Sequence, residues 1–446
     1  MTKNTIPTER PKQRAFLIGA EFFNNDNILP LEESMQELAM LADTAGLDVV
    51  GMATQRLKNP DPKTFLGSGK VQEVKLLVED VVADMVIFDD ELSPRHQREL
   101  EKVFGENVQV LDRTALILDI FAMHAQTREG GLQVELAQYE YRLPRLTRAW
   151  THLARQAGGG GGRAGGVGGV GLRGPGETQL EVDRREISRR IGHLREELEK
   201  VRAHRSRYRQ RRQKQEIPVI ALVGYTNAGK STLLNQITDS DVYVADKLFA
   251  TLDPTTRKVS MDDGREVLVT DTVGFIQKLP TQLVAAFRAT LEEITEADLL
   301  VHVVDSTHPS AEQHALAVSQ TLEELEAHMQ PMIVALNKID ALSSPAYLSE
   351  LLNLFDQAVP ISGQTGAGIP ELMKAIAREL FERKQQISVR IPYKFGKLIS
   401  QFYDYGQIQK SVNEEEGIFL QGAVPDRLAS RFEPFAVEEG NFPPQE

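Results

Sequence analysis

The sequence predicts an α/β fold with several domains, the largest of which is a phosphate-loop (P-loop) nucleotide-binding domain. Short apolar runs alternate with helical patterns over residues 13–125 and again over 217–385, which is typical of parallel sheets covered by helices. A loop rich in glycine and ending in Lys-Ser follows a buried apolar run at residues 224–231. The 446 residues are too many for one hydrophobic core and suit about three domains.

Composition excludes several classes of protein. Hydrophobic residues make up 41% and charged residues 26%, which is ordinary for globular proteins. No run reaches the roughly eighteen apolar residues of a membrane-spanning helix, and the N-terminus lacks the apolar core of a signal peptide. The absence of cysteine excludes disulfides, thiolate zinc sites and cysteine nucleophiles. We therefore expect a cytoplasmic protein and leave open whether it visits a membrane surface.

Residues 1–125 predict an N-terminal α/β domain. Apolar runs favour strands at 15–19, 47–51, 85–88 and 108–111, and amphipathic patterns favour helices near 31–45 and 70–81. The segment Gly67-Ser68-Gly69-Lys70 is similar to a short phosphate loop, but the full pattern would need glycine in place of Thr64. A turn at the start of a helix is the better interpretation, and ATP binding by this domain is left open.

Residues 126–216 predict a helical hairpin. Two apolar stripes have the same 4, 3, 4, 3 spacing, which favours two antiparallel helices, the first kinked by Pro144. The stripes are Leu132, Leu136, Tyr139, Leu143 and Leu146, then Ile187, Ile191, Leu194, Leu198 and Val201. Between them lies a glycine-rich loop, 158–176, with twelve glycines in nineteen residues. It can be a plain flexible connection or a loop that orders on a large polyanion, and the two interpretations are compatible.

A basic run follows at the end of the second helix. Residues 200–214 contain eight Lys or Arg and no acid, although the whole chain has a net charge of −13. A solvated helix face is the usual interpretation of a charge run. Because like charges here recur four residues apart without compensating acids, we favour contact with RNA phosphates. We expect this basic end and the glycine-rich loop to form one RNA-binding end of the hairpin.

Residues 217–385 predict a GTPase domain with four ordered motifs. A strand at 219–223 leads into the phosphate loop, where Lys230 would reach the β- and γ-phosphates and Ser231 would bind Mg²⁺. Asp271 would hold the outer shell of the magnesium ion, and the Gly274 N–H would sense the γ-phosphate. The complete loop is Gly224, Tyr225, Thr226, Asn227, Ala228, Gly229, Lys230 and Ser231, and the second motif is Asp271, Thr272, Val273 and Gly274.

The last two motifs predict guanine specificity. The carboxylate of Asp340 can accept two hydrogen bonds from guanine that adenine cannot supply, so adenine would leave it unpaired. The third motif is Asn337, Lys338, Ile339 and Asp340, and the fourth, expected to cover the base, is Ser362, Gly363 and Gln364. The order and spacing of the four motifs match a translation-factor-type GTPase that cycles between GTP and GDP.

Two positions bear on hydrolysis. Phe275 stands where Ras-type enzymes place the glutamine that orients the attacking water, so we expect slow intrinsic hydrolysis and activation by a partner. Asn227 either braces the loop through hydrogen bonds to the backbone or coordinates a K⁺ ion against the phosphates.

The final residues, 386–446, predict a small α+β domain with strands near 387–391 and 417–420 and a helix at 395–403, and they suggest no chemistry of their own.

The chain resembles the HflX family of ribosome-associated GTPases over nearly its full length. The stretches that carry the resemblance are 112–122 (DRTALILDIFA), 174–181 (GPGETQLE) and 249–253 (FATLD). By the family's pattern, Thr251 belongs to switch I and binds Mg²⁺ beside Ser231. The switch residues Phe249, Ala250, Thr251, Leu252 and Asp253 would line the nucleotide. Lys230, Thr251 and Gly274 are then the residues expected to act in hydrolysis.

The resemblance also implies a partner. It implies a protein that binds the large (50S) ribosomal subunit and its RNA and acts in splitting or rescuing stalled ribosomes. We also expect a monomer, and a role in ribosome biogenesis or under stress is left open. One alternative is a GTP-dependent RNA-modification or RNA-remodelling factor that does not act on assembled ribosomes. Another is an ATP-driven, helicase-like remodeller that uses Gly67–Lys70. Neither the ribosomal state that is recognised nor the physiological trigger can be inferred from the sequence.

Overall fold

The computed structural model shows two compact units, which we describe one at a time. It describes residues 12–23, 29–146, 175–215, 217–238, 248–249, 251–261, 264–278, 293–327, 329–342, 344–355, 357–382 and 384–437. Unit 1 contains residues 1–214 and unit 2 contains most of the chain from residue 215 onward. Two stretches of the predicted GTPase domain, 245–253 and 273–291, belong to unit 1. The multidomain α/β fold class is confirmed.

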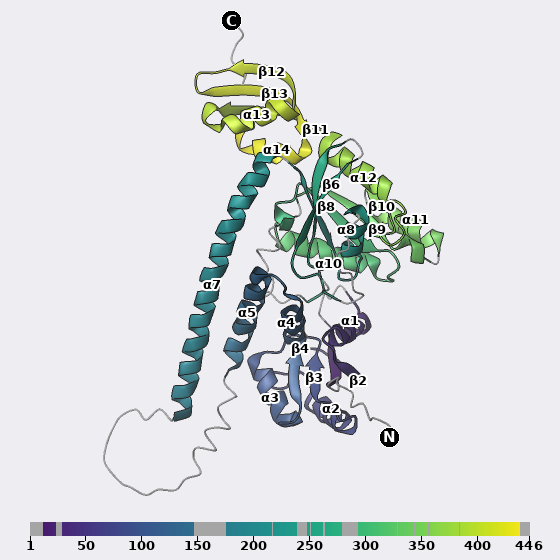
Figure 1. The fold of residues 1–446 in the computed structure, drawn as a ribbon. Coiled ribbons are helices and arrows are strands. Elements are labelled where there is room, and N and C mark those ends of the chain that lie inside the picture. Colours follow the sequence, from purple (N-terminus) through teal and green to yellow (C-terminus); the bar gives the residue numbers. More distant parts are fainter. Residues whose placement is uncertain are drawn as a thin grey trace, which may run out of the picture. The chain divides into compact units, whose positions relative to one another are not determined.

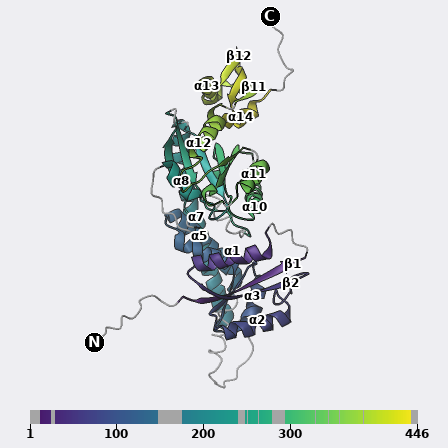
Figure 2. The same cartoon turned by 90° about the vertical axis from the view of Figure 1, so that its right-hand side faces the viewer.

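Unit 1 is built on a four-stranded, wholly parallel sheet with the order β2-β1-β3-β4. Its strands are β1 (Arg14–Phe22), β2 (Asp48–Leu57), β3 (Met85–Phe88) and β4 (Gln109–Asp112). Its helices are α1 (Leu31–Thr44), α2 (Ser68–Asp80), α3 (Pro94–Phe104) and α4 (Arg113–His124). Figure 2 shows α1 on one side of this sheet and α2 with α3 on the other. The predicted strands and the first two helices are confirmed.

The segment Gly67–Lys70 forms a helix start. Helix α2 begins at Ser68, and the Gly67 N–H donates to the Gln55 side chain at 3.1 Å. The Lys70 ammonium pairs with Glu73, one turn further along the same helix, at 2.8 Å. These contacts support the turn at the start of a helix rather than a second phosphate loop.

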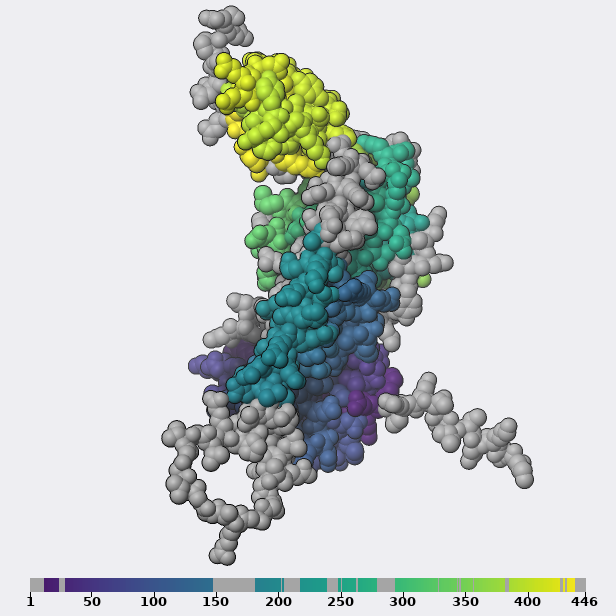
Figure 3. All heavy atoms as spheres, turned by 60° about the vertical axis from the view of Figure 1, so that its left-hand side comes forward, coloured from purple at the N-terminus to yellow at the C-terminus, as the bar shows by residue number. Residues whose placement is uncertain are grey.

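The predicted hairpin is formed by α5 (Arg128–Arg142) and α7 (Pro175–Gln215), which lie side by side (Figures 1 and 3). Both apolar stripes meet in one cluster, in which Leu136, Ile191, Leu194 and Leu198 are buried. Interhelical ion pairs flank the cluster, among them Arg190–Glu135 and Arg195–Glu140. The predicted kink at Pro144 is wrong, because α5 ends at Arg142 and Pro144 lies in a separate 3-10 turn, η1 (Leu143–Arg145).

The chain order separates two features that we expected to lie together. The glycine-rich loop precedes α7, whereas the basic run occupies the other end of the same helix. A straight helix rises 1.5 Å per residue, so Pro175 and Lys200 lie about 37 Å apart. The expectation of a single RNA-binding end is therefore wrong. Residues 158–174 of the loop and the side chains of 204–214 lie outside the described residues.

Unit 2 contains a six-stranded sheet with the order β10-β9-β8-β5-β7-β6, in which only β6 is antiparallel to its neighbour. The strands are β5 (Val219–Gly224), β6 (Thr255–Ser260), β7 (Glu266–Asp271), β8 (Leu299–Asp305), β9 (Met332–Asn337) and β10 (Ala358–Pro360). Helices α8 (Lys230–Thr238) and α12 (Ile369–Ala377) share one core cluster with the sheet. Helices α10 (Ala311–Glu324) and α11 (Pro345–Leu354) share another.

The C-terminal part of unit 2 is a small antiparallel sheet with the order β11-β13-β12. Its elements are β11 (Lys384–Pro392), α13 (Gly396–Tyr405), β12 (Gln407–Asn413), β13 (Gly417–Pro425) and α14 (Asp426–Phe432). Both helices pack on it through Phe402, Leu428 and Phe432. The α+β prediction is correct, although strand β12 was not predicted. Across the described residues, no helix has the length and apolar character needed to cross a membrane.

Candidate functional site

The carboxyl ends of the parallel strands in unit 2 bring three of the predicted motifs to one edge of the sheet. The phosphate loop follows β5, Asp271 ends β7, and Asn337 ends β9. In open α/β sheets this edge is where ligands bind. The fourth motif, which begins at Ser362 after β10, is hydrogen-bonded to Asn337 and so reaches the same place.

The phosphate loop is held by a close approach to the third motif. Gly229 has φ +94°, and a Cβ at this position would collide with the Asn337 side-chain amide. Asn227 has φ +59°, a left-handed conformation that asparagine tolerates better than most residues. Helix α8 begins immediately afterwards at Lys230, so its first-turn N–H groups and the positive end of its dipole favour phosphate there.

Lys230 is almost fully buried within this loop. Its ammonium donates to the carbonyl oxygens of Gly224 at 3.1 Å and Tyr225 at 2.9 Å. Burial lowers the pKa of Lys230 to about 8, and the charge of Asp271 only partly opposes this effect. A phosphate group would provide the negative charge that the two carbonyl groups lack, and would raise this pKa again.

Ser231 and Asp271 form an oxygen pair suited to Mg²⁺. The Ser231 hydroxyl donates to the fully buried Asp271 carboxylate at 2.6 Å. The neighbouring Thr272 hydroxyl donates to the Leu222 carbonyl at 2.6 Å and so fixes the end of β7 against β5. A hydroxyl and a carboxylate match the preference of Mg²⁺ for a few protein oxygens supplemented by phosphate and water. Bound there, Mg²⁺ would neutralise negative charge that develops on the phosphates.

Asn337 braces the site. Its side-chain N–H donates to the Ala228 carbonyl at 2.8 Å, and its side-chain oxygen accepts from the Gly363 N–H at 2.8 Å. One residue thereby joins the phosphate loop to the loop expected to cover the base. The carboxylate of Asp340, in the 3-10 turn η2 (Ile339–Ala341), is exposed and can accept hydrogen bonds from guanine. Lys338 pairs with Asp305 at 2.6 Å.

An aromatic stack that the sequence did not reveal supports the phosphate loop. The Tyr225 ring lies parallel to the His314 ring of α10, with 3.9 Å between centroids. Burial, followed by the charge of His308, lowers the pKa of His314 to about 4, so the ring is neutral at pH 7. Nothing in the spacing of His314, which lies about ninety residues downstream of Tyr225, could have indicated this contact.

The predicted switch residues fall in unit 1. Phe249 packs edge-on against Phe121 of α4 with 4.7 Å between centroids, Leu252 is buried, and the Asp253 carboxylate lies at the start of α5. Val273, Gly274 and Phe275 belong to the same unit, and so does Thr251. Ala250 lies outside the described residues. Phe275 is 1% exposed, so its ring is part of the core of the protein.

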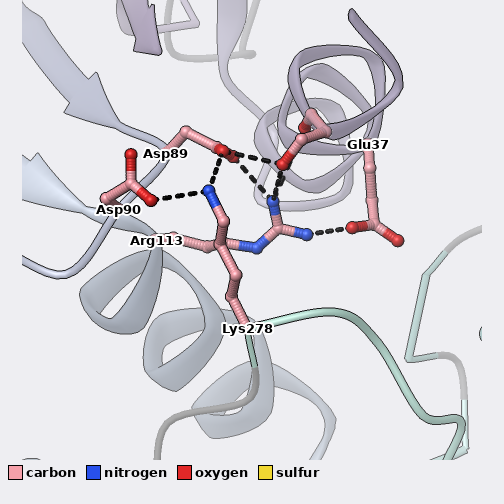
Figure 4. A network of polar contacts seen from close by, with 6 residues as sticks. Glu37, Asp89, Asp90, Arg113 and Lys278 are labelled. Atoms are coloured by element: carbon pink, nitrogen blue, oxygen red, sulfur yellow. Dashed lines mark hydrogen bonds and ion pairs between the residues drawn. The ribbon is translucent and has the colours of Figure 1, made fainter. Parts of the chain in front are cut away.

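A buried network of charges in unit 1 includes Lys278, four residues after Gly274 (Figure 4). The Lys278 ammonium lies 2.5 Å from Asp89 and 2.6 Å from Asp90, which follow β3. Arg113, at the start of α4, pairs with Asp89 at 2.7 Å and with Glu37 of α1. Burial alone would raise the pKa of Asp89, but the charges of Arg113 and Lys278 hold it below its ordinary value. Burial raises the pKa of Asp90.

Family models match three consecutive parts of the chain. Residues 32–122 match the family described as "GTP-binding GTPase N-terminal", 124–212 match "GTP-binding GTPase Middle Region", and 219–338 match "50S ribosome-binding GTPase". In a solved structure, a GTP-binding protein from Sulfolobus solfataricus in complex with GDP is 25% identical. That match covers 82% of this chain and 98% of that one, with a TM-score of 0.42.

Curated relatives extend the similarity over almost the whole chain. GTPase HflX of Caldanaerobacter subterraneus is 45% identical over 96% of this chain and 95% of its own length. GTPase HflX of Escherichia coli is 45% identical over 88% of this chain and 90% of its own. With the phosphate loop, the Ser231–Asp271 pair and the Asp340 carboxylate at one sheet edge, the chain belongs to the HflX family of GTPases and hydrolyses GTP.

Proposed function

We propose that this GTPase is a nucleotide-controlled switch that binds the large ribosomal subunit and acts in splitting or rescuing ribosomes. The family description of residues 219–338 as a 50S ribosome-binding GTPase supports the choice of partner. The observation that carries the RNA contact is the distribution of charge along α7. Arg190 and Arg195 pair with Glu135 and Glu140 of α5, whereas beyond Lys200 the helix has seven more basic residues and no acid.

Uncompensated positive charge of this kind suits the phosphate backbone of ribosomal RNA. Neutralising each phosphate releases condensed counterions, so the affinity of such a contact falls steeply with salt. The first half of α7 has no such surplus, because acids alternate with its arginines. We therefore assign the RNA contact to residues 200–214. The glycine-rich loop, at the other end of α7, would be a second and separate contact.

The nucleotide site provides the switch. Lys230 would hold the β- and γ-phosphates, Asp340 would select guanine, and Ser231 with Asp271 would hold Mg²⁺. Thr251 and Gly274 would respond to the γ-phosphate. Because Phe275 is buried and has no hydrogen-bonding group, it does not orient the attacking water. Large subunits should therefore accelerate hydrolysis strongly, by positioning the water or by supplying another group.

Cosedimentation with purified large subunits, with a non-hydrolysable GTP analogue and with GDP, tests the proposal. Binding that requires the GTP analogue is expected. A quadruple variant replaces Arg205, Arg207, Arg209 and Arg211 with Ala. It should bind more weakly, and its slope of log affinity against log salt should flatten by about 0.7–0.9 per lost phosphate contact. GTP affinity should stay unchanged.

A matched control removes the same number of arginines from the acid-rich part of α7. Replacing Arg184, Arg185, Arg189 and Arg190 with Ala should leave the salt slope as it is in the wild type. Equal losses in both quadruple variants would show that the protein responds only to total charge and would contradict the assignment. Equal affinity for large subunits with the GTP analogue and with GDP would contradict the hypothesis of a nucleotide-controlled switch. It would favour the alternative of an RNA-modification partner.

A further inference from the structure

The carboxylate of Asp253 completes the N-terminal cap of α5. One of its oxygens accepts from the backbone N–H groups of Gln126 at 2.9 Å and Thr127 at 2.8 Å. The other accepts from the Thr127 hydroxyl at 2.5 Å. Thr127 is itself the N-cap residue, and its hydroxyl oxygen accepts from the Gly130 N–H at 3.0 Å. A negative charge at this end of a helix is favoured by the helix dipole and by charge-assisted hydrogen bonds.

A glycine in the first turn of α5 is explained by this carboxylate. Glycine is among the poorest helix formers, yet α5 contains two in succession, Gly130 and Gly131. A Cβ on Gly130 would collide with the Asp253 carboxylate, whereas a Cβ on Gly131 would have no atom within 4 Å. The Asp253 carboxylate therefore occupies the position that a side chain at residue 130 would need, whereas the corresponding position at residue 131 is open.

Two further side chains attach the same stretch of chain. Phe249 is 3% exposed and packs on Phe121, and Leu252 is 2% exposed. Phe249 also has φ +58°, which is a costly conformation for a bulky residue and persists only where the surroundings enforce it. The stretch that carries Thr251 is thus attached on both sides of that residue.

We infer that Asp253 is a positioning residue through which the nucleotide state acts on the first turn of α5. Thr251, expected to respond to Mg²⁺ and the γ-phosphate, lies only two residues from Asp253. A change in the position of Thr251 therefore changes how well the carboxylate caps α5. By thermodynamic linkage, formation of the cap changes the relative affinity for GTP and GDP by the same free energy by which the exchange of nucleotide changes the cap. Through α5 the effect reaches the hairpin, and its consequence for RNA binding rests on the proposed function.

Amide hydrogen exchange of the full chain, without ribosomes, tests this inference. In the wild type, the backbone amides of Gln126 and Thr127 should exchange at rates that differ at least about threefold between GDP and a non-hydrolysable GTP analogue. Gly130→Ala, which displaces the carboxylate, should make the two rates equal. The matched control Gly131→Ala should keep the wild-type difference. Because the readout needs no ribosome, its result is independent of the proposed function.

A double-variant cycle keeps the test decisive if Gly130→Ala folds poorly. In a protein that already carries Asp253→Ala, there is no carboxylate for Gly130→Ala to displace. Since alanine favours the helix over glycine, Gly130→Ala should then slow the amide exchange of α5 as much as Gly131→Ala does. Asp253→Ala alone should also abolish the nucleotide dependence. The inference is overturned if the wild-type amides exchange equally with both nucleotides. It is also overturned if either Gly130→Ala or Asp253→Ala retains the wild-type difference.

Discussion

Replacing Lys278 by Met should destabilise the sheet of unit 1, because it leaves two buried carboxylates facing one another. Asp89 keeps the charge of Arg113, but Asp90 loses the only cation that lies within 4 Å of it among the described residues. Breaking a buried ion pair costs about 3–5 kcal/mol. The Lys278 and Asp90 side chains are 19% and 16% exposed, so we expect about 2–3 kcal/mol at neutral pH.

The sign of the pH dependence distinguishes charge from packing. Asp90 has a raised pKa in the folded state, so its ionisation costs stability at neutral pH, and the cost disappears as pH falls through that pKa. Removing Lys278 raises the pKa of Asp90 further, so in the variant Asp90 becomes protonated, and the loss of stability begins to disappear, at a higher pH. Asp89 has a lowered pKa, and its stabilising contribution is lost only below its ordinary value of about 3.9. The stability deficit of the variant should therefore shrink as the pH falls from neutrality towards the ordinary carboxyl pKa of about 3.9.

Hydrogen exchange of the amides of β3 measures the opening free energy of this sheet directly. Asp90→Asn in the background of Lys278→Met should recover at least about 1 kcal/mol, since it removes the uncompensated charge. Lys70→Met is the matched control, because its i, i+3 pair with Glu73 contributes only about 0.2–0.5 kcal/mol. A deficit that is independent of pH and is not reduced by Asp90→Asn would refute the electrostatic explanation.

Three further predictions concern the nucleotide site. Asp340→Ala should lower GTP affinity by about a hundredfold or more without improving ATP binding, and competition binding that still favours GTP would contradict its role. Above about pH 8, the binding of GTP should be accompanied by proton uptake at Lys230. Burial lowers the pKa of Lys230 to about 8 in the protein without nucleotide, and the bound phosphates would raise it. Affinity should then fall up to about tenfold per pH unit, and calorimetry in buffers of different ionisation enthalpy that detects no proton uptake would contradict this. If Asn227 coordinates K⁺, hydrolysis should be faster in KCl than in NaCl at equal ionic strength, and Asn227→Ala should remove the difference. Equal wild-type rates in both salts would exclude K⁺.

The four strands of the first sheet and β5 of the second could be predicted because parallel, two-sided burial leaves continuous apolar runs in the sequence. Residues 85–88 and 219–223 are examples, and both form central strands. Strand β12 escaped prediction because it lies at an edge and most of its side chains are exposed, so its sequence has no apolar run. The kink at Pro144 failed for another reason. The periodic pattern continues to Leu146 even though the regular helix has already ended at Arg142.

The position of the candidate nucleotide site in the fold could be predicted where the chemistry of one motif fixes its place after a strand. Lys230, Ser231, Asp271 and Asp340 all belong to this class. The roles of Asn337 and His314 were not predictable, because each depends on a contact with a residue about ninety to one hundred and ten positions away in the sequence. Periodicity and propensity describe neighbours along the chain, whereas these contacts are set by which strand ends meet at the sheet edge.

The stretch 112–122 shows how one family motif can contain two separate physical roles. The Asp112 carboxylate caps α4 through the Ala115 N–H and also accepts from the Leu92 N–H and the Tyr141 hydroxyl, which joins α5 to the sheet. The next residue, Arg113, points into the charged network that includes Lys278. Asp112 therefore holds the helix that begins with the Asp253 cap, while Arg113 balances the carboxylates that bind Lys278. The stretch that carries Asp253 and the stretch that carries Lys278 are thus held in unit 1 through two consecutive residues, Asp112 and Arg113. A substitution at either residue should weaken the attachment of one stretch and leave that of the other.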